Sequence, residues 1–310
     1  MIRTESDTPP EQFEFDLAIA AVGYERRCRY SIKKYGIKGR VSLGLEFGFL
    51  TSHSYPDNRQ FFLDEGFQLI VGMGAETSKR ISDAIISYGP TDRPTTVFVD
   101  ISSMSREMIS HVLLGLQTAL GQKSLVVSAA YAPSKFSGAY QSAPIRRDGP
   151  IVSKLAGWSS RPDYPLGVIF GLGCEPNLAL GALQLLEPRK AWLFEPVGTD
   201  PNYDEAMRAA NSGIGDIFDV TSFAYDITRP TMLRGRFEAL LNAVESDFRL
   251  VVVPFGPKIF AWSTIFTVAL GARPTIGVWA FSSKDQATPV DRDSEGDVVW
   301  HQTTIDCSVL

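Results

Sequence analysis

Hydrophobic positions along this chain form short continuous runs, and amphipathic segments of helical length separate the runs. In the first half, strands are predicted at residues 15–22, 41–47, 67–72, 96–100 and 125–131, with helices at 25–35, 75–88 and 105–120. In the second half, strands are predicted at 167–171, 190–194, 250–253, 275–281 and 298–304, with helices at 176–186, 203–210, 230–245 and 259–270. Continuous apolar strands between helices are typical of a mainly parallel sheet covered on both faces. We therefore expect an α/β fold of two tandem Rossmann-like units.

The periodicity is lost between residues 132 and 165, where Pro, Gly, Ser and Arg are frequent. The sequence thus predicts a first unit at 1–135, a linker or hairpin at 136–165 and a second unit at 166–310. Three landmarks recur after 150, 149 and 154 residues: Gly23 and Gly173, Glu46 and Glu195, and Val99 and Val253. This nearly constant spacing predicts an internal duplication.

Composition and charge narrow the classes of function. The 310 residues are 44% hydrophobic and 21% charged, with a net charge of −5. An acidic chain argues against general duplex nucleic-acid binding, which requires many phosphates to be neutralised. Residues 24–40, however, carry seven basic side chains against Glu25 alone, or +6. This local excess favours a phosphate-bearing ligand or a nucleic-acid strand, and a solvated helix face is the alternative.

The cysteines and the apolar segments indicate the expected cellular compartment and whether the chain associates with a membrane. The cysteines (Cys28, Cys174 and Cys307) form no CxxC pair, so a reduced cytoplasm is expected. The first 15 residues do not resemble a signal peptide. The apolar run at 250–271 is interrupted by Pro254, Gly256 and Pro257, which favours a buried strand, turn and helix over a membrane span. We expect no membrane association.

Ligands of open α/β sheets bind beyond the carboxyl ends of the strands, where this chain has four polar turns. In the first, Gly23 would let a ligand approach the backbone, and Tyr24, Glu25 and Arg26 follow it at the start of a helix. The second turn supplies hydroxyl groups and a cation that suit phosphate or ribose oxygens: Asp100, Ser102, Ser103, Ser105 and Arg106. A serine that caps the helix, with Asp100 accepting turn amides, is the alternative.

The other two turns lie in the second half. Gly173, Cys174 and Glu175 follow a predicted strand, and Glu195 lies 22 residues beyond Gly173, as in dinucleotide-binding folds. Pro176 interrupts the glycine pattern of that motif. In the fourth turn, Gly256 precedes Lys258, which could contact a phosphate or extend to solvent.

Several common motifs are missing from the sequence. It contains no G-x-x-x-x-G-K-[ST], no HExxH and no G-x-S-x-G. The loop at 291–297 begins like a calcium loop but has Gln302 at the twelfth position, so we interpret it as an acidic hairpin. We expect no cofactor and no metal site.

The turn at 100–108 resembles the signature of CRISPR-associated Rossmann-fold (CARF) domains and the related SAVED sensors. The Gly23-Tyr24-Glu25 turn resembles the other ligand loop of the family, and Gly256-Pro257-Lys258 resembles a second copy of the signature. The resemblance implies binding of a cyclic or linear oligonucleotide messenger between two Rossmann-like lobes, in an antiviral defence system. It also implies a sensor that acts on an effector partner, and it is compatible with an oligomer.

Two alternatives stay open. One is an enzyme that hydrolyses or modifies a nucleotide-like substrate with Glu25 and Glu175 as paired acids. The other is a non-catalytic interaction subunit in which the two sheets are only a scaffold.

Overall fold

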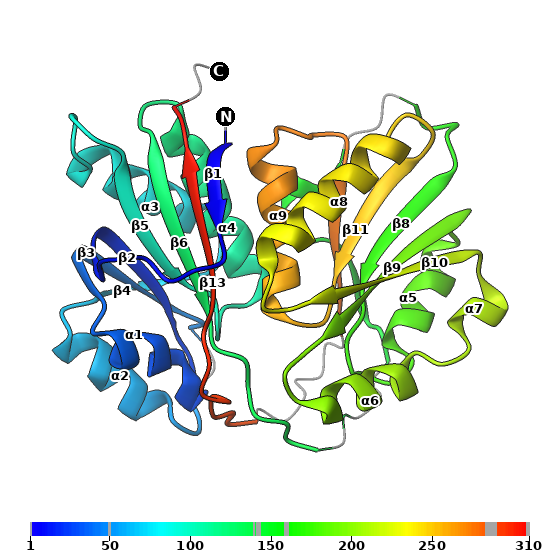
Figure 1. Ribbon diagram of the computed structural model, residues 1–310, viewed down its shortest axis with the longest axis horizontal. Coiled ribbons are helices and arrows are strands. Elements are labelled where there is room, and N and C mark those ends of the chain that lie inside the picture. The colour runs from blue at the N-terminus through cyan, green and yellow to red at the C-terminus, as the bar shows by residue number, and fades with distance from the viewer. Residues whose placement is uncertain are drawn as a thin grey trace. The chain divides into compact units, whose positions relative to one another are not determined.

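The computed structural model describes residues 2–48, 51–138, 140, 144–157, 161–282 and 290–307 (Figure 1). The chain divides into two compact units, one made of Met1–Lys135 with Pro289–Leu310 and the other of Phe136–Thr288. Each unit is a sheet of mostly parallel strands with helices, which confirms the predicted α/β, Rossmann-like fold class.

The first unit contains a seven-stranded sheet. Its strands are β1 (Ile2–Ser6), β2 (Glu14–Val22), β3 (Lys38–Glu46), β4 (Gln68–Val71), β5 (Thr95–Asp100), β6 (Leu125–Tyr131) and β13 (Val299–Ile305). They lie in the order β1-β13-β6-β5-β2-β3-β4, in which the five strands from β6 to β4 are parallel. β13 is antiparallel to β6, and β1 is antiparallel to β13.

Helices cover both faces of this sheet (Figure 1). One face carries the 3₁₀ helix η1 (Arg26–Arg29), α1 (Tyr30–Tyr35) and α2 (Tyr55–Asp64), and the other carries α3 (Ala75–Tyr88) and α4 (Arg106–Leu120). β2 is buried from its second residue to its last because helices lie on both sides of it. Alternate residues of β2, among them Ala18, Ala20 and Val22, pack with Ile32 of α1 and Phe62 of α2.

The second unit contains a six-stranded sheet. Its strands are β7 (Arg147–Pro150), β8 (Leu166–Gly171), β9 (Lys190–Val197), β10 (Val220–Asp226), β11 (Arg249–Pro254) and β12 (Gly277–Ser282). They lie in the order β10-β9-β8-β11-β12-β7, all parallel except β7, which is antiparallel to β12. A short 3₁₀ helix, η2 (Ser153–Leu155), follows β7.

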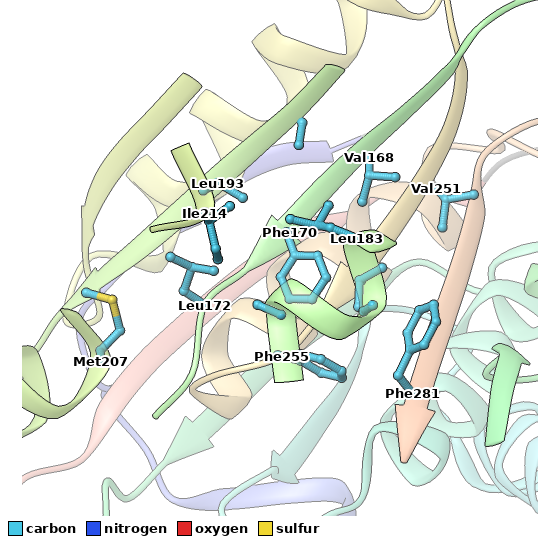
Figure 2. Packing of buried hydrophobic residues seen from close by; sticks show 14 residues of the cluster. Val168, Phe170, Leu172, Leu183, Leu193, Met207, Ile214, Val251, Phe255 and Phe281 are labelled. Carbon is cyan, nitrogen blue, oxygen red and sulfur yellow. The ribbon is translucent and has the colours of Figure 1, made fainter. Parts of the chain in front are cut away.

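Helices also cover both faces of the second sheet. α5 (Leu178–Leu186), α6 (Pro201–Ala210) and α7 (Ile214–Ile217) lie on one face, and α8 (Pro230–Val244) and α9 (Lys258–Leu270) lie on the other (Figure 1). Alternate residues of β8, such as Val168 and Phe170, pack against Leu183 of α5, Met207 of α6 and Ile214 of α7 (Figure 2). This alternation places apolar side chains on both faces of a central strand.

The two sheets share one topology. When the parallel strands of each unit are numbered in chain order, both sheets have the order 3-2-1-4-5, followed by one antiparallel strand beside the fifth. The direction of winding reverses between the first and fourth strands, which are β2 and β5 in the first unit and β8 and β11 in the second. Open α/β sheets bind ligands at such switch points, beyond the carboxyl ends of the two strands.

The structure differs from the expected domain limits at two places. β13 belongs to the first sheet, although its residues were expected in a second unit spanning 166–310. The region 136–165, expected to be a linker, contributes β7 to the edge of the second sheet. Both differences concern pairing between strands far apart in the chain, which a local hydrophobic pattern does not specify.

Six elements in the described part of the chain lack a sequence prediction: β1, α2, β7, η2, α7 and β10. β1 and β10 are edge strands of mixed burial, and α2 is mostly polar, so none of these three has the continuous apolar pattern of the central strands. The helix predicted over 25–35 is divided into η1 and α1, and Arg27 is buried within η1. Glu195 lies within β9, because this strand extends to Val197.

The apolar run at 250–271 forms β11, a turn and α9, as the sequence predicts. Every residue of α9 from Ile259 to Ala269 is buried, which accounts for its apolar composition. Within the described ranges, no helix combines the length and hydrophobicity that crossing a membrane requires.

Trp300 of β13 joins the C-terminal strand to the core of the first unit, where it lies beside Phe13, Tyr35 and Phe98. We expect Trp300→Ala to lower the free energy of unfolding by about 3–5 kcal/mol, because the substitution leaves a cavity among these rings. Urea unfolding followed by circular dichroism measures the effect. Tyr88→Ala, at a half-exposed aromatic residue of the same unit, is the control. Equal losses in both variants would contradict the assignment of Trp300 to this core.

Candidate functional site

The first two turns meet at the switch point of the first unit. β2 and β5 are hydrogen-bonded neighbours, with Ala20 opposite Asp100, so both strands end at the same edge of the sheet. A Cβ atom at Gly23 would lie 3.3 Å from the ring of Phe47 and 3.8 Å from Cβ of Ser103. The crowding is with the ring of Phe47, which follows β3, whereas the distance to Ser103 in the turn after β5 is an ordinary contact.

Glu25 is the centre of a buried polar cluster at this point. Its Oε2 accepts hydrogen bonds from Nε of Arg27 at 2.8 Å and from Oγ of Ser103 at 3.2 Å. Its Oε1 accepts a longer one, at 3.4 Å, from Nη1 of Arg292. Glu25 and Arg27 are buried, whereas Ser103 and Arg292 are partly exposed. One carboxylate thus binds two guanidinium groups and a hydroxyl group.

Arg27 links this cluster to the end of β6. Its Nη1 donates to the carbonyl oxygen of Ala132 at 3.1 Å. Burial opposes the charged form of Arg27, but the neighbouring Glu25 carboxylate more than compensates and raises the pKa of this guanidinium above its ordinary value. Arg27 is therefore a permanent buried cation, stabilised by its partner.

A strap, residues 291–296, crosses the first turn from the C-terminal part of the chain. Asp291 accepts bonds from the backbone amide of Arg26, from Nε of Arg26 and from Oγ of Ser54. Burial alone would raise the pKa of Asp291, but the bonds from Ser54 and Arg26 hold it below its ordinary value. The carbonyl oxygen of Gly296 accepts from the Tyr30 hydroxyl group and from Lys34, both at 2.6 Å.

The backbone of the first turn is also held from α2. Asn58 is fully buried, and its Nδ2 donates to the carbonyl oxygens of Gly23 at 2.8 Å and Glu25 at 2.9 Å. The amide of Ser54 donates to the carbonyl oxygen of Tyr24 at 3.2 Å. Tyr24 itself is partly buried, and burial raises the pKa of its phenol. The turn is therefore fixed between α2 and the strap.

Asp100 and Ser102 shape the second turn from within. Oδ1 of Asp100 accepts the amide of Ser102 at 2.9 Å, and Oγ of Ser102 accepts the amide of Ala132 at 2.8 Å. Both side chains are buried, and burial raises the pKa of Asp100 to about 6 in spite of hydrogen bonding to Ser102. Asp100 therefore accepts a turn amide, as one of the two expectations for this turn had it, and Ser102 bonds to the end of β6 rather than capping the helix.

Ser105 and Arg106 begin α4. Ser105 is the N-cap residue, since its Oγ accepts the amide of Met108 at 3.0 Å. Its hydroxyl group also lies 3.7 Å from Sδ of Met73. Arg106 is the first residue of α4 and is partly exposed. Of the hydroxyl groups expected at this turn, that of Ser103 lies beside the Glu25 carboxylate.

The other two turns meet at the switch point of the second unit. Gly256 has a positive φ of 69°, and a Cβ atom there would overlap the carbonyl oxygen of Leu172. A Cβ atom at Gly173 would lie 2.5 Å from Oε2 of Glu175 and 3.2 Å from the amide nitrogen of Gly256. Two backbone segments therefore approach here as closely as glycine allows.

The remaining candidates lie around this second contact. Glu175 is exposed, and Lys258 is the partly exposed first residue of α9. Cys174 is partly buried, with Sγ 3.7 Å from the carbonyl oxygen of Tyr203. Glu195 lies in β9 opposite Ala224 of β10, one strand away from the switch point. Arg26, expected as a ligand contact in the first unit, pairs with Asp291 instead.

Sequence reasoning missed three residues of the first site: Arg27, Asn58 and Arg292. Arg27 lies beside Arg26, and only the structure distinguishes the buried arginine from the exposed one. Arg292 is a basic residue between two acidic residues of the loop at 291–297, which was a weak signal. Among the residues that the structure describes, no group of three or more His, Cys, Asp or Glu side chains could hold a metal ion.

Gly256→Ala tests the close approach of the two turns in the second unit. We expect it to lower the free energy of unfolding by about 3 kcal/mol, because the new Cβ atom meets backbone and the left-handed conformation is strained. Gly235→Ala is the matched control, since Gly235 lies inside α8 with no atom within 4 Å of the new Cβ position. That control should gain about 0.5–1 kcal/mol. Urea unfolding compares the two variants, and a neutral Gly256→Ala would contradict the geometry.

Asp100→Asn tests the buried carboxyl group of the first unit. The pKa of Asp100 is about 6 in the folded chain and 3.8 as its ordinary value, so the folded state holds an extra proton between these limits. Raising the pH from about 4 to about 6 should therefore cost the wild type about 2 kcal/mol of unfolding free energy through this group. The variant lacks this loss and keeps an oxygen for the Ser102 amide.

Urea unfolding across this pH range measures the difference between wild type and Asp100→Asn. The variant should gain stability relative to the wild type as the pH rises. Asp83→Asn, at an exposed residue of α3, should leave the pH dependence unchanged. Parallel curves for wild type and Asp100→Asn would show that Asp100 does not titrate in this range.

Comparisons with known proteins bear on the fold. No protein-family model and no curated protein sequence matches the chain. Among solved structures, the chain is similar to a type III CRISPR defence DNA nuclease activated by cyclic oligoadenylate, with a TM-score of 0.50 and 8% identity. The similarity covers 86% of this chain and 65% of the nuclease, so the chain spans less than two thirds of that protein. At this identity the similarity is one of fold.

Proposed function

We propose that this chain is a cytoplasmic sensor of the defence type that binds a nucleotide or oligonucleotide messenger at the switch points of its Rossmann-like units. The observation that carries the proposal is the pairing of the polar turns. Gly23 and Glu25 lie against Ser103 in one unit, and Gly173 lies against Gly256 in the other. Each pair therefore lies at the edge of its sheet where open α/β folds take ligands.

The chemistry of the turns suits a ligand with phosphate and hydroxyl groups. The first unit offers the Ser103 hydroxyl group and the cations Arg106 and Arg292 at or near its turns, all partly exposed. The second unit offers Lys258 and a glycine-lined backbone. Arginine and hydroxyl donors match phosphate oxygens, and lysine contributes a positive charge.

The similar solved structure supports the class of ligand. That protein is a defence nuclease activated by cyclic oligoadenylate, and this chain shares its fold. We accordingly place cyclic and linear oligoadenylates first among the candidate messengers. Because the chain spans 65% of that protein, its nuclease activity is not part of the proposal. A sensor of this type would transmit ligand binding to an effector partner.

The shared strand order supports a duplication of one ancestral unit. Both sheets have the order 3-2-1-4-5 with an added antiparallel strand beside the fifth. The landmark residues Gly23 and Gly173 lie in the turns after the first strand of each unit. Duplication would give one chain two related ligand turns with different side chains.

The enzymatic alternative requires Glu25 to transfer protons. In this structure both oxygens of the Glu25 carboxylate accept hydrogen bonds, from Arg27, Ser103 and Arg292. This carboxylate already holds three donors from separate segments in place. Glu25 and Glu175 also differ in environment, since the first is buried and the second exposed. We therefore favour binding over hydrolysis and over a purely structural role.

Titration calorimetry with cyclic and linear oligoadenylates, ATP and AMP tests the proposal. Arg106→Gln and Lys258→Gln should each weaken binding about tenfold if each side chain contacts a phosphate. Lys38→Gln should leave the affinity unchanged, because Lys38 is exposed at the start of β3, at the opposite edge of the sheet. Wild-type protein that binds none of these nucleotides would overturn the proposal.

A further inference from the structure

The donors around Glu25 form a set that is unusual for a single carboxylate. Arg27, Ser103 and Arg292 come from three separate segments: η1, the turn after β5 and the strap. Together they offer guanidinium and hydroxyl groups to one small volume. A carboxylate and a phosphoryl group accept such donors with similar geometry, but a phosphoryl group offers more oxygen atoms and more charge.

Two guanidinium groups lie around the Glu25 carboxylate. Arg27 and Arg292 face the single carboxylate of Glu25, and Arg26 is already paired with Asp291. Tyr131 also hydrogen-bonds Arg27, and the buried Asp100 carboxyl group, whose pKa Arg27 lowers, is bonded to the Ser102 amide. Among the described residues, Nε of Arg292 is buried without a hydrogen-bond partner. The set can therefore accept an anion of higher charge than one carboxylate.

Arg292 is held in place independently of Glu25. Its carbonyl oxygen accepts the amide of Arg27 at 3.3 Å, and its neighbour Asp291 is bonded to Arg26 and Ser54. The Glu25 backbone is likewise fixed, because Asn58 binds its carbonyl oxygen. The turn and the strap are thus each held by bonds that do not involve the Glu25 carboxylate. The 3.4 Å bond to Arg292 is the weakest of the three that this carboxylate accepts.

We propose that Arg27, Arg292 and Ser103 form an anion subsite for one phosphoryl group of the ligand, which the Glu25 carboxylate occupies in this structure. The inference rests on the proposed nucleotide binding and specifies how the first unit would take part in it. Glu25 acts as an internal competitor that keeps the buried arginines paired until a phosphoryl group displaces it. A competitor of this kind lowers the affinity for weak anions and so selects ligands with further contacts.

Glu25→Gln tests the displacement with inorganic phosphate as the probe. The substitution removes the competing charge, so the full-length variant should bind phosphate about tenfold more tightly than the wild type. If Glu25 instead held the ribose or base of a nucleotide, Glu25→Gln would weaken nucleotide binding. Calorimetry gives the affinity, and the rise in melting temperature with added phosphate gives an independent measure.

Arg292→Gln keeps the test decisive if Glu25→Gln does not fold. Arg292 is partly exposed on the strap, so its loss should preserve the fold and weaken phosphate binding about tenfold. Asp16→Asn is the matched control, because Asp16 is a buried carboxylate paired with Arg93 at the start of β2, at the other edge of the sheet. It should leave the phosphate affinity unchanged.

The subsite would be overturned if Glu25→Gln folds and binds phosphate no better than wild type. It would also be overturned if Arg292→Gln keeps wild-type phosphate affinity, or if Asp16→Asn gains as much affinity as Glu25→Gln. The oligoadenylate titration separates this failure from that of the proposed function. If wild type binds an oligoadenylate but Glu25→Gln and Arg292→Gln do not change phosphate affinity, the sensor proposal holds and the subsite proposal fails. If the variants change phosphate affinity as expected but wild type binds no oligoadenylate, the anion subsite holds and the nucleotide proposal fails.

Discussion

The buried ion pair between Glu25 and Arg27 organises the switch point of the first unit. Removing two such charges from water costs several kcal/mol per ion, so the pair is stable only where each charge has further partners. Glu25 has Ser103 and Arg292, and Arg27 has the carbonyl oxygen of Ala132. Through these bonds, one pair joins the turns after β2 and β5, the end of β6 and the strap. The cost of leaving either charge unpaired fixes their relative positions.

The two units reach a similar architecture with different chemistry at their switch points. The first contains buried charge, with a glycine only where the turn after β2 passes the ring of Phe47. The second depends on Gly256, whose left-handed backbone passes the carbonyl oxygen of Leu172 where no side chain fits. A shared strand order therefore provides the location of a site, while the side chains decide what it recognises.

The strap gives the C-terminal part of the chain a direct role at the first switch point. It follows the second unit in the sequence and leads into β13, which completes the first sheet. Asp291 and Gly296 fix it to the turn and to α1, so Arg292 reaches Glu25 from a well-anchored backbone. Exchange of the Glu25 carboxylate for a ligand phosphoryl group would alter the bonds of a segment that connects both units.

Local hydrophobic periodicity and turn chemistry were enough to predict the fold class, most strands and helices and the four turns at the strand ends, because each depends on a short segment of chain. The sequence also identified Gly23, Glu25, Ser103 and Gly256. Only the tertiary structure decided that β13 completes the first sheet, that Arg27 rather than Arg26 is buried, and that Arg292 joins Glu25. Pairing across 267 residues and the choice between adjacent arginines depend on long-range packing and on the desolvation of charge, which no local pattern encodes.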